Sequence, residues 1–511
     1  VRMEEKVGDK RFPAKTIAQF LSPTDRFDGA AQRYLLTGDT GDKEAETVII
    51  DECSMMTEEM LAATFEALAG VKRLILVGDH RQLPPIGAGK PFVDIVRFLE
   101  PESFTSPFPK LHAETGYTEL TISMRQSEVA GGRDDVRLAG WFTGTELPPG
   151  EDDVLGLLSG RRKSKHLEIL EWNSAQELHQ MLSKALHHEL GENGKLTQER
   201  FDELLGATLS NGYSYFNPGK AGKYAETWQI LTPVRQHPWG VAELNRTLHN
   251  QWRKGNMEAA RKTRLRKFCK PMGPEQIVYG DKVINNRNHL RWSWSPGARR
   301  PLANGEIGMG VTKWGTKDEI HVEFSTQNGL NFCYKPAEFS DDGSTDLELA
   351  YALTVHRSQG SEFGKVLLIL PRNRRMLSRE MLYTALTRQR EKVIILCEGP
   401  AMELVSLAND RFSETKTRFT NLFRAPNPKL FEKSYLDANL IHQTERTYYW
   451  EHCGMLFDAE YARRWEEKKA LYRKHGIEEG GGPKGTLIVT RDNSIGGISS
   501  KAIGELIEML L

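Results

Sequence analysis

The sequence predicts an α/β fold built on open parallel sheets, and two short segments carry most of that prediction. Residues 47–56 read TVIIDECSMM, and residues 73–85 read RLILVGDHRQLPP. Each is a run of aliphatic residues that ends in a cluster of acidic and polar side chains, which is typical of a strand followed by a turn. Because ligands bind beyond the carboxyl ends of parallel strands, we expect Asp51, Glu52 and the turn at residues 78–82 to share one crevice.

The residue types in this crevice suit the hydrolysis of a nucleoside triphosphate. A carboxylate after a strand can hold Mg²⁺ against the β- and γ-phosphates, and a second carboxylate can orient or deprotonate the attacking water. Asp51 is the candidate for the metal and Glu52 for the water. Gln82 both donates and accepts hydrogen bonds, as a sensor of the γ-phosphate must. A solvated turn is the alternative for a lone Asp-Glu pair, and the second strand with its GDxxQLPP sequence favours the site.

Three later segments repeat the pattern of a strand followed by a polar cluster. They are residues 120–126 (LTISMRQ), 349–370 (LAYALTVHRSQGSEFGKVLLIL) and 382–396 (LYTALTRQREKVIIL). In each, a basic residue stands next to Gln, Thr or Ser. Guanidinium groups that reach a nucleotide from a second domain stabilise the charge that gathers on the γ-phosphate oxygens. Arg125 and Arg388 are the candidates, and a surface salt bridge is the alternative for each taken singly.

In this order, the motifs resemble those of the RecD-like helicases of superfamily 1. The matches are motif II at Asp51 and Glu52, motif III at 78–82, motif IV at Arg125, motif V at 354–362, and motif VI at 384–388. The segments WQILTPVR (228–235) and GDKVINNRN (280–288) also match, so the resemblance covers about residues 14–400. An ordered series of motifs is a specific signal.

The resemblance implies two RecA-like motor domains that bind ATP and Mg²⁺ at their interface and move 5′ to 3′ along single-stranded DNA. The nucleotide contacts expected in the matched motifs are Gly78, Asp79, Gln82, Arg125, Gly360, Glu362 and Arg388. The residues themselves give a reason to expect a DNA strand at motif V, because polar side chains there can bond backbone phosphates and a glycine allows close approach. These DNA candidates are Thr354, His356, Arg357, Ser358 and Gln359. A packed or capping histidine is the alternative for His356.

One part of the family pattern is missing. A motor of this kind needs a G-x-x-x-x-G-K-[ST] loop, whose backbone amides cradle phosphate and whose Lys neutralises it. Every Gly-Lys pair in this sequence is followed by a residue other than Ser or Thr. Residues 14–21 (AKTIAQFL) resemble the segment that lies downstream of that loop in the family. We therefore expect this sequence to be the later part of a longer protein.

Composition supports a multidomain globular protein without choosing its function. The 511 residues include 69 basic and 69 acidic side chains, so the whole chain has no general attraction to polyanions, and nucleic-acid binding must rest on local patches. The densest patch is at residues 261–270 (RKTRLRKFCK), preceded by Arg253 and Lys254, and a solvated helix face is its alternative. No apolar run approaches the roughly 18 residues of a membrane span, so we expect a cytoplasmic protein with no membrane partner. The five cysteines are widely separated and include no C-x-x-C pair, which predicts bystander thiols.

The expected domain order follows from these segments. We expect a first motor domain at 1–127, a helical connector at 128–227, a second motor domain at 228–291 and 347–400, and an accessory domain at 401–511. Within the connector, residues 175–190 have the apolar spacing of a helix. An insert at 292–346 resembles the SH3-like barrel that the family places in its second motor domain, and residues 319–335 predict a hairpin around Asn-Gly. Trp292 and Trp294 either form the core of this insert or stack on bases, with the core favoured.

The C-terminal segment resembles the later half of a restriction-endonuclease-like fold. Residues 447–455 (TYYWEHCGM) and 482–492 (GPKGTLIVTRD) predict two strands on either side of a helix. Glu451 is the one well-placed candidate ligand for a nuclease metal. The pattern departs from PD-(D/E)xK because the expected Lys is absent after Glu451 and no upstream Pro-Asp pair is found. A scaffold or protein-contact module is the favoured alternative, so a protein partner could bind here.

Together these observations predict an ATP-dependent DNA helicase or translocase that acts on single-stranded or partially duplex DNA, in genome maintenance or anti-phage defence. Two alternatives stay open. One is an RNA helicase of the same superfamily, since phosphate contacts alone do not exclude the 2′-hydroxyl. The other is a helicase-derived nuclease or scaffold protein in which ATP only gates the C-terminal module.

Overall fold

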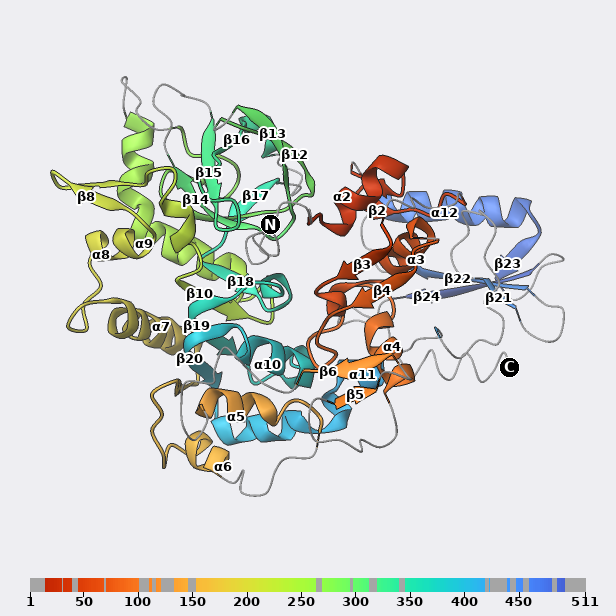
Figure 1. The fold of residues 1–511 in the computed structure, drawn as a ribbon, viewed down its shortest axis with the longest axis horizontal. Coiled ribbons are helices and arrows are strands. Elements are labelled where there is room, and N and C mark those ends of the chain that lie inside the picture. Colours follow the sequence, from red (N-terminus) through yellow and green to blue (C-terminus); the bar gives the residue numbers. More distant parts are fainter. Residues whose placement is uncertain are drawn as a thin grey trace. The chain divides into compact units, whose positions relative to one another are not determined.

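The computed structural model of the chain describes residues 14–29, 31–38, 45–68, 70–100, 110–112, 116–120, 133–145, 153–262, 269–294, 297–311, 319–339, 345–418, 422, 439–441, 447–453, 459–479 and 485–491. The chain divides into two compact units, Val1–Arg424 and Ala425–Leu511. Figure 1 shows the helices and strands of both units. Among the described residues, no helix has both the length and the apolar character that a membrane crossing needs.

The first part of unit Val1–Arg424, here called the first lobe, is built around two parallel strands. Its elements are α2 (Ile17–Leu21), β1 (Phe27–Asp28), β2 (Arg33–Tyr34), β3 (Thr47–Ile50), α3 (Glu58–Ala67), β4 (Arg73–Leu76), α4 (Pro91–Leu99), β5 (Lys110–His112) and β6 (Tyr117–Glu119). β3 and β4 pair in register from Thr47 opposite Arg73 to Ile50 opposite Leu76. This pairing confirms the two strands predicted from the apolar runs. Thr57 caps the N-terminus of helix α3, and its side chain accepts a hydrogen bond from the Met60 N–H at 3.2 Å.

The apolar side chains of this lobe are divided between a core and an exposed face. Ile50, Cys53, Leu61 and Phe92 belong to one buried cluster. Ile49, which points to the opposite face of the same strand as Ile50, is 54% exposed. The two-stranded sheet is therefore covered on one face by α3 and α4 residues and open on the other, among the residues that the structure describes.

The second lobe contains a five-stranded sheet whose neighbouring strands are all parallel. Its strands and flanking helices are α5 (Asp134–Gly140), α6 (Asp153–Leu158), β7 (Leu167–Trp172), α7 (Ala175–Leu190), α8 (Gln198–Leu204), β8 (Thr208–Ser210), β9 (Tyr213–Tyr215), β10 (Trp228–Thr232), α9 (Val241–Lys262), β18 (Ala352–Thr354), β19 (Phe363–Leu370), α10 (Arg379–Leu386), β20 (Gln389–Glu398) and α11 (Glu414–Thr417). The strand order is β18-β10-β19-β20-β7. Four of these strands are fully buried in their centres, which is why their sequences read as continuous apolar runs. The sheet confirms the predicted α/β class.

β7 lies in the segment that we expected to be a helical connector. It pairs with β20 from Leu167 opposite Val393 to Trp172 opposite Glu398, and thereby becomes the edge strand of the second-lobe sheet. The following helix α7 begins and ends at the residues that the apolar spacing predicted, with the Ser174 hydroxyl accepting from the Glu177 N–H at 3.2 Å. Residues 128–227 therefore contribute a strand as well as helices, and the helical description of this segment was incomplete.

A second sheet of the same lobe is antiparallel and has seven strands. They are β11 (Lys282–Asn285), β12 (His289–Ser293), β13 (Ala298–Leu302), β14 (Ile307–Val311), β15 (Ile320–Phe324), β16 (Phe332–Tyr334) and β17 (Leu347–Leu349), in the order β13-β12-β16-β15-β14-β11-β17. The predicted hairpin is present as β15 and β16, with Ile320 opposite Tyr334. Gly329 of its Asn-Gly pair has φ +81°, a left-handed conformation that favours glycine. The sheet starts before residue 292 and continues past residue 346, and its likeness to an SH3-like barrel stays a prediction.

The two tryptophans of this sheet are not in its core. Trp292 is 45% exposed and Trp294 is 43% exposed, and their rings meet edge to face with centroids 6.5 Å apart. They alternate with buried Arg291 and Ser293 on β12, so the pleat of the strand places both on its outer face. The expectation that favoured a core position was wrong for these two residues, while base stacking stays a prediction.

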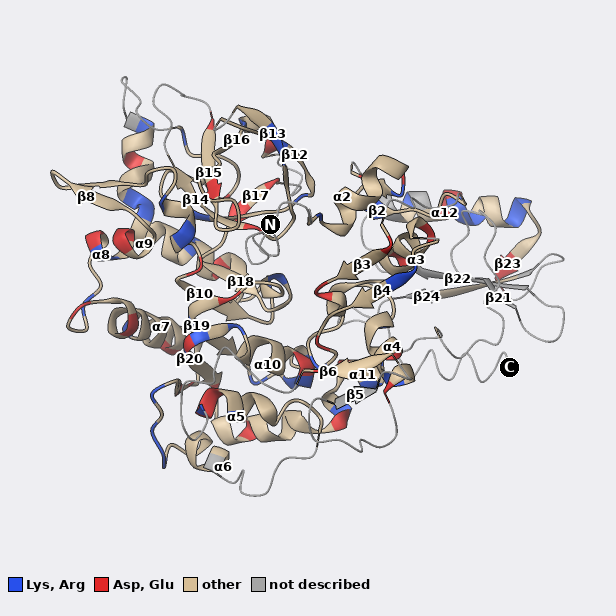
Figure 2. Cartoon of the chain, viewed as in Figure 1, with Lys and Arg blue, Asp and Glu red and all other residues tan. Residues whose placement is uncertain are grey.

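Unit Ala425–Leu511 holds a four-stranded sheet and one long helix. The elements are β21 (Asn439–Ile441), β22 (Thr447–Cys453), α12 (Ala459–Lys474), β23 (Ile477–Glu479) and β24 (Gly485–Arg491), and the strand order is β21-β22-β24-β23. β22 and β24 are parallel, as a strand-helix-strand unit requires. Figure 2 shows acidic and basic residues interspersed along α12. The two predicted strands and the helix between them are thus confirmed.

Candidate active site

The two strand ends of the first lobe are held side by side by backbone hydrogen bonds that continue beyond the strands. The Val77 N–H donates to the Ile50 carbonyl at 2.8 Å, and the Cys53 N–H donates to the Val77 carbonyl at 2.9 Å. Asp51 and Glu52 lie between these contacts and are both exposed. The predicted acidic pair and the predicted turn therefore share one edge of the sheet, as the parallel pairing requires.

Glu52 has a backbone conformation that few residues adopt. Its φ is +55°, in the left-handed region, and its N–H donates to Asp51 Oδ1 at 2.9 Å. A residue other than glycine in this region is uncommon and is retained where the surroundings hold it in place. Here the conformation ends β3 and starts the short 3₁₀ helix Cys53–Met55. The two carboxylates consequently lie at the sheet edge rather than continuing along the strand.

The residue that follows Glu52 reports on the electrostatics of this edge. Burial raises the pKa of the Cys53 thiol to about 12, and the negative charges of Asp51 and Glu52 raise it further against a hydrogen bond with Val77. Cys53 is therefore a protonated, buried thiol next to two exposed carboxylates. A site with this charge distribution suits a hard divalent cation with oxygen ligands.

The turn after β4 is shaped by close packing and by the side chain of Asp79. A Cβ on Gly78 would lie 2.9 Å from the Phe92 ring and 3.1 Å from the Cys53 nitrogen, so the sheet edge has no room for a larger residue. Asp79 Oδ1 accepts from the Arg81 N–H at 3.0 Å, and Asp79 Oδ2 accepts from Gln82 Nε2 at 3.4 Å. Asp79 therefore orients the turn and the side chain of Gln82.

This turn is bonded to the second lobe at three points. Tyr383 donates its hydroxyl to Asp79 Oδ2 at 2.8 Å. At the end of the turn, the Leu83 N–H donates to Thr384 Oγ1 at 2.8 Å, and Gln359 Nε2 donates to the Leu83 carbonyl at 2.8 Å. Both backbone groups of Leu83, which is buried, are thus bonded by side chains of the other lobe. Gln359 and Thr384 come from the two segments that resemble motifs V and VI.

Tyr383 is a neutral donor in this arrangement. Burial raises its pKa, and the charge of Asp79 raises it further. The phenol therefore keeps its proton at neutral pH and its contact with Asp79 is a charge-assisted hydrogen bond. Sequence reasoning did not single out Tyr383, because one tyrosine within an apolar helix gives no signal of a contact with a distant turn.

Arg388 is buried at the end of α10 and its guanidinium is held by its own lobe. Nε donates to the Thr384 carbonyl at 3.1 Å, Nη1 to the Ser361 carbonyl at 3.3 Å, and Nη2 to Thr387 Oγ1 at 3.3 Å. These acceptors are neutral, so the positive charge has no carboxylate among these three partners. These three contacts hold the guanidinium rigidly at the end of α10.

The segment that resembles motif V has a mixed role. The hydroxyl of Ser358 is buried and donates to the Val355 carbonyl at 2.7 Å, so it closes a turn instead of facing outward. Gln359 bonds the first lobe, as described above. His356 and Arg357 are partly exposed, and Arg357 Nη1 forms an ion pair with Glu348 at 2.8 Å. Thr354 Oγ1 accepts from the Arg357 N–H at 3.3 Å. The expectation that Ser358 bonds a phosphate is therefore replaced by a structural role.

One glycine and one glutamate of the same segment stay candidates for nucleotide contact. Gly360 has φ +73° and is exposed, with open space around a hypothetical Cβ. Its backbone conformation, rather than a close protein contact, is what requires glycine there. Glu362 is partly exposed two residues later. Arg125 lies outside the described residues, and so does the side chain of Glu451, whose backbone is in β22.

A further contact of the two lobes comes from Arg418. Its Nη1 donates to three carbonyls of the first lobe, those of Pro85 at 2.6 Å, Gly87 at 3.1 Å and Gly89 at 3.1 Å. The N–H groups of this one nitrogen are therefore shared among three carbonyls of the same loop. Arg418 follows the last helicase-like motif by about thirty residues in the sequence, and no sequence signal pointed to it.

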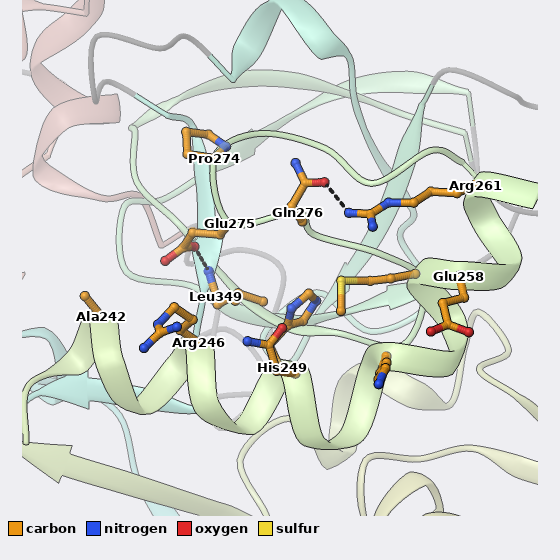
Figure 3. A pocket seen from close by; sticks show the side chains of 12 residues that line it. Ala242, Arg246, His249, Glu258, Arg261, Pro274, Glu275, Gln276 and Leu349 are labelled. Carbon is orange, nitrogen blue, oxygen red and sulfur yellow. Dashed lines mark hydrogen bonds between the residues drawn. The ribbon is translucent and has the colours of Figure 1, made fainter. Parts of the chain in front are cut away.

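A hollow among the described residues lies away from this turn (Figure 3). It has a volume of about 760 Å³ between α9 and residues 274–276. Arg261 Nη2 donates to Gln276 Oε1 at 3.0 Å at one end, and the Leu349 N–H donates to Glu275 Oε2 at 2.6 Å at the other. None of the residues predicted to contact the nucleotide, and none of the motif V candidates for DNA binding, lines this hollow. The candidate active site is instead the edge of the first-lobe sheet, where the acidic pair Asp51–Glu52 and the turn at residues 78–82 lie together.

The basic cluster near this hollow is smaller than the sequence suggested. Arg253 is fully buried, and its guanidinium bonds Asp202 at 2.6 Å and the Gly280 carbonyl. It therefore holds α9 against the core and does not belong to a surface patch. Lys254 and Arg261 do line the hollow, and residues 263–268 of the cluster lie outside the described residues.

Comparison with known proteins places the two motif-bearing regions in families. Residues 1–132 match an AAA domain, and residues 349–396 match a UvrD-like helicase C-terminal domain. The first region carries Asp51, Glu52 and the turn at 78–82, and the second carries motifs V and VI.

Several curated proteins are similar to the chain over most of its length. An uncharacterized protein (MJ1519) of Methanocaldococcus jannaschii is 26% identical over 91% of this chain and 42% of its own length. The ATP-dependent RecD2 DNA helicase of Deinococcus radiodurans is 27% identical over 71% of this chain and 38% of its own. The RecBCD enzyme subunit RecD of Mycolicibacterium smegmatis is 25% identical over 69% of this chain and 50% of its own. The chain thus spans half or less of the length of these relatives.

A solved structure, Pif1 helicase from Bacteroides in complex with ADP-AlF3 and single-stranded DNA, is 16% identical, with a TM-score of 0.35 over 74% of this chain and 78% of that chain. The two matched domains and the relatives named RecD and RecD2 agree with the ordered motifs. These matches support a RecD-like helicase of superfamily 1, to which the chain is similar in both regions.

Proposed function

We propose that the chain is the motor portion of an ATP-dependent DNA helicase or translocase that moves 5′ to 3′ on single-stranded DNA. The observation that carries this proposal is the bonding of the turn at residues 79–83 to Gln359, Tyr383 and Thr384. A motor must transmit the state of its nucleotide to the lobe that moves. Here Leu83 follows the candidate phosphate sensor Gln82, and side chains of the other lobe bond both its N–H and its carbonyl.

The acidic edge fits a nucleotide-bound Mg²⁺. Asp51 and Glu52 are adjacent, exposed carboxylates at the carboxyl end of a parallel strand, and oxygen ligands of this kind suit Mg²⁺. When bound, the cation would neutralise charge on the β- and γ-phosphates. Asp51 would hold the cation, and Glu52 would orient the attacking water and accept its proton. Gln82, held by Asp79, would donate to the γ-phosphate.

The DNA contacts would come from the partly exposed side chains of motif V. Burial lowers the pKa of His356, so its imidazole is neutral at pH 7 and donates one hydrogen bond. Arg357 is paired with Glu348, and a phosphate would have to replace that carboxylate. Thr354 would support the backbone of the same turn. Contacts of these types hold the sugar-phosphate backbone and read no base sequence.

The role of Glu52 is tested by Glu52→Gln in the natural full-length protein. Gln keeps the size of the side chain and loses the base, so we expect ATP binding to persist and turnover to be lost. Equilibrium binding of a fluorescent ATP analogue and steady-state hydrolysis measure the two properties. Glu59→Gln, an exposed acid on α3 of the same lobe, is the matched control and should hydrolyse ATP normally. Normal hydrolysis by Glu52→Gln would refute the assignment.

The role of Arg388 is tested in the same assay. Arg388→Ala should lower kcat by about 10³-fold or more if the guanidinium stabilises the transferring phosphoryl group. Arg388→Lys keeps the charge but loses the planar fork, and should recover only part of that rate. Circular dichroism shows whether each variant folds. An unchanged kcat for Arg388→Ala would show that the residue only caps α10.

The substrate and direction are tested with partial duplexes. Matched DNA and RNA duplexes with either a 5′ or a 3′ single-stranded tail separate the proposed activity from an RNA helicase of the same superfamily. We expect unwinding of DNA from a 5′ tail, and faster unwinding of RNA would overturn the assignment. We also propose that unit Ala425–Leu511 is an accessory domain that contacts a protein partner, and its nuclease-like resemblance stays a prediction.

A further inference from the structure

Hairpin β15–β16 brings three metal-binding side chains to one face of the antiparallel sheet. His321 and Cys333 are directly opposite each other in the pairing of the two strands. Glu319 precedes His321 by two residues, which places both on the same face of an extended chain. One ligand atom from each of the three lies within 4.8 Å of the other two. His321 Nε2 lies 3.5 Å from Glu319 Oε2.

The donor set is one that zinc prefers. Thiolate sulfur, imidazole nitrogen and carboxylate oxygen bind Zn²⁺ at roughly 2.0 to 2.3 Å in a tetrahedron, which puts ligand atoms roughly 3.3 to 3.8 Å apart. The His321–Glu319 distance already has this value. His321 is 1% exposed and Cys333 is 8% exposed, while the Glu319 side chain is 23% exposed. The cluster is therefore anchored by two rigid ligands and reachable from solvent on the carboxylate side.

Two other three-donor groups of the described residues differ in their neighbours. Glu189 in the group Glu168, His188 and Glu189 is paired with Lys365 and Lys392. Glu338 and Asp346 in the group with His289 are both paired with Arg291. In those groups a basic side chain already occupies the place of a cation.

Among the described residues, no Lys or Arg forms an ion pair with Glu319. A carboxylate close to a buried imidazole and a buried thiol leaves negative charge that a divalent cation would balance. Zn²⁺ binds the thiolate form of cysteine, so binding at this cluster would release the Cys333 thiol proton to solvent. A bound metal would neutralise the Glu319 carboxylate, as Lys and Arg neutralise carboxylates in the two other groups.

We propose that Glu319, His321 and Cys333 form a zinc site that staples hairpin β15–β16, with solvent as the fourth ligand. No C-x-x-C pair marks this site, because the ligands come from two paired strands, with His321 and Cys333 twelve positions apart. Trp294, whose ring centroid lies 6.2 Å from that of His321, is the neighbouring exposed aromatic residue. The site is separate from the proposed nucleotide chemistry and does not depend on it.

Metal content and a cobalt substitute test the proposal on the whole chain. We expect one equivalent of zinc to be retained after dialysis. Co²⁺ in its place should give the thiolate-to-metal charge-transfer absorption that only a Cys ligand produces. Cys333→Ser should abolish that absorption and lower zinc affinity by at least ~100-fold. The loss of an outer-shell partner alone can cost up to about that factor, and Cys333 would bind the metal directly. Cys397→Ser, another buried thiol outside any three-donor group of the described residues, is the matched control and should bind as the parent does.

A second variant keeps the test decisive if Cys333→Ser does not fold. Glu319→Gln retains the size of a partly exposed side chain, and should lower zinc affinity at least about 10-fold while leaving the cobalt–thiolate absorption in place. Saturating zinc should also raise the Tm of the parent and of Cys397→Ser, since a ligand that binds only the folded state stabilises it. Equal zinc affinity of the parent and Cys333→Ser, or no stoichiometric zinc binding by the parent, would show that His321 and Glu319 form only an ion pair beside a bystander thiol.

Discussion

The bond between the Leu83 N–H and Thr384 Oγ1 gives a quantitative test of how the lobes are joined. Thr384→Val keeps the shape and the β-branch of the side chain and removes the acceptor. Leu83 is fully buried, so its N–H would be left without that partner away from water. A buried donor without its partner costs about 1 to 3 kcal/mol. Local opening of the turn should therefore become about 5- to 150-fold more favourable.

Hydrogen exchange measures this opening at the residue concerned. Mass spectrometry of peptides that cover residues 79–90, or amide exchange followed by NMR, should show the Leu83 amide exchanging about 5- to 150-fold faster in Thr384→Val, since exchange follows the free energy of local opening. Thr64→Val is the matched control. Its hydroxyl donates to the Met60 carbonyl at 2.6 Å within its own helix, so its loss exposes no donor. Unchanged exchange at Leu83 in Thr384→Val would refute the account of the lobe contact.

Two partly buried carboxylates make opposite predictions for the dependence of stability on pH. Burial raises the pKa of Glu275 from 4.5 to about 7, so its cost is absent below about pH 4.5 and grows to its full size near pH 7. Glu275→Gln should be more stable than the parent by about 1 to 3 kcal/mol at pH 8 and equal to it at pH 4, as compared by denaturant unfolding. For Glu189, burial would raise the pKa, but hydrogen bonds from Lys392 and Lys365 lower it to about 2, so its contribution is complete above about pH 4.5 and is lost as the pH falls toward 2. Glu189→Gln should lose about 2 to 3 kcal/mol at pH 7 and about 1 kcal/mol less at pH 4, and a constant difference would contradict the ion-pair explanation.

The elements that sequence predicted best are those set by local patterns. Helix α7 has both an apolar spacing and a capping residue, and it was predicted to the residue. Strands β3 and β4 are short apolar runs that end in polar clusters, and they were predicted with their parallel arrangement. The hairpin β15–β16 was predicted from the alternation of apolar and polar residues around an Asn-Gly pair. The connecting loop is longer than that pair suggests, because β15 ends at Phe324 and β16 begins at Phe332.

The elements that sequence missed depend on partners far along the chain. β7 reads LEILEW in a segment dominated by helices, and only its pairing with β20 makes it part of the sheet. Trp292 and Trp294 have the composition of core residues, but the register of β12 decides which side is buried. Arg253 lies next to a basic run and is nevertheless the buried partner of Asp202. In each case the deciding contact is with a residue that sequence spacing does not connect.

The same limit applies within the candidate site, and it has a mechanistic consequence. Motif V was expected to supply a row of DNA contacts, but the 3₁₀ turn His356–Ser358 sends successive side chains in different directions. Gln359 bonds the Leu83 carbonyl in the first lobe, while its own N–H donates to the His356 carbonyl at 3.3 Å. We infer that a movement of the turn that carries Gln82 would reach the DNA candidates His356 and Arg357 through Gln359, without passing through the sheet. If so, single-stranded DNA should slow exchange of the Leu83 amide in the parent and have little effect in Thr384→Val, where the turn is already released. If DNA leaves the exchange rate of the Leu83 amide unchanged in both proteins, the two sites are coupled by another route.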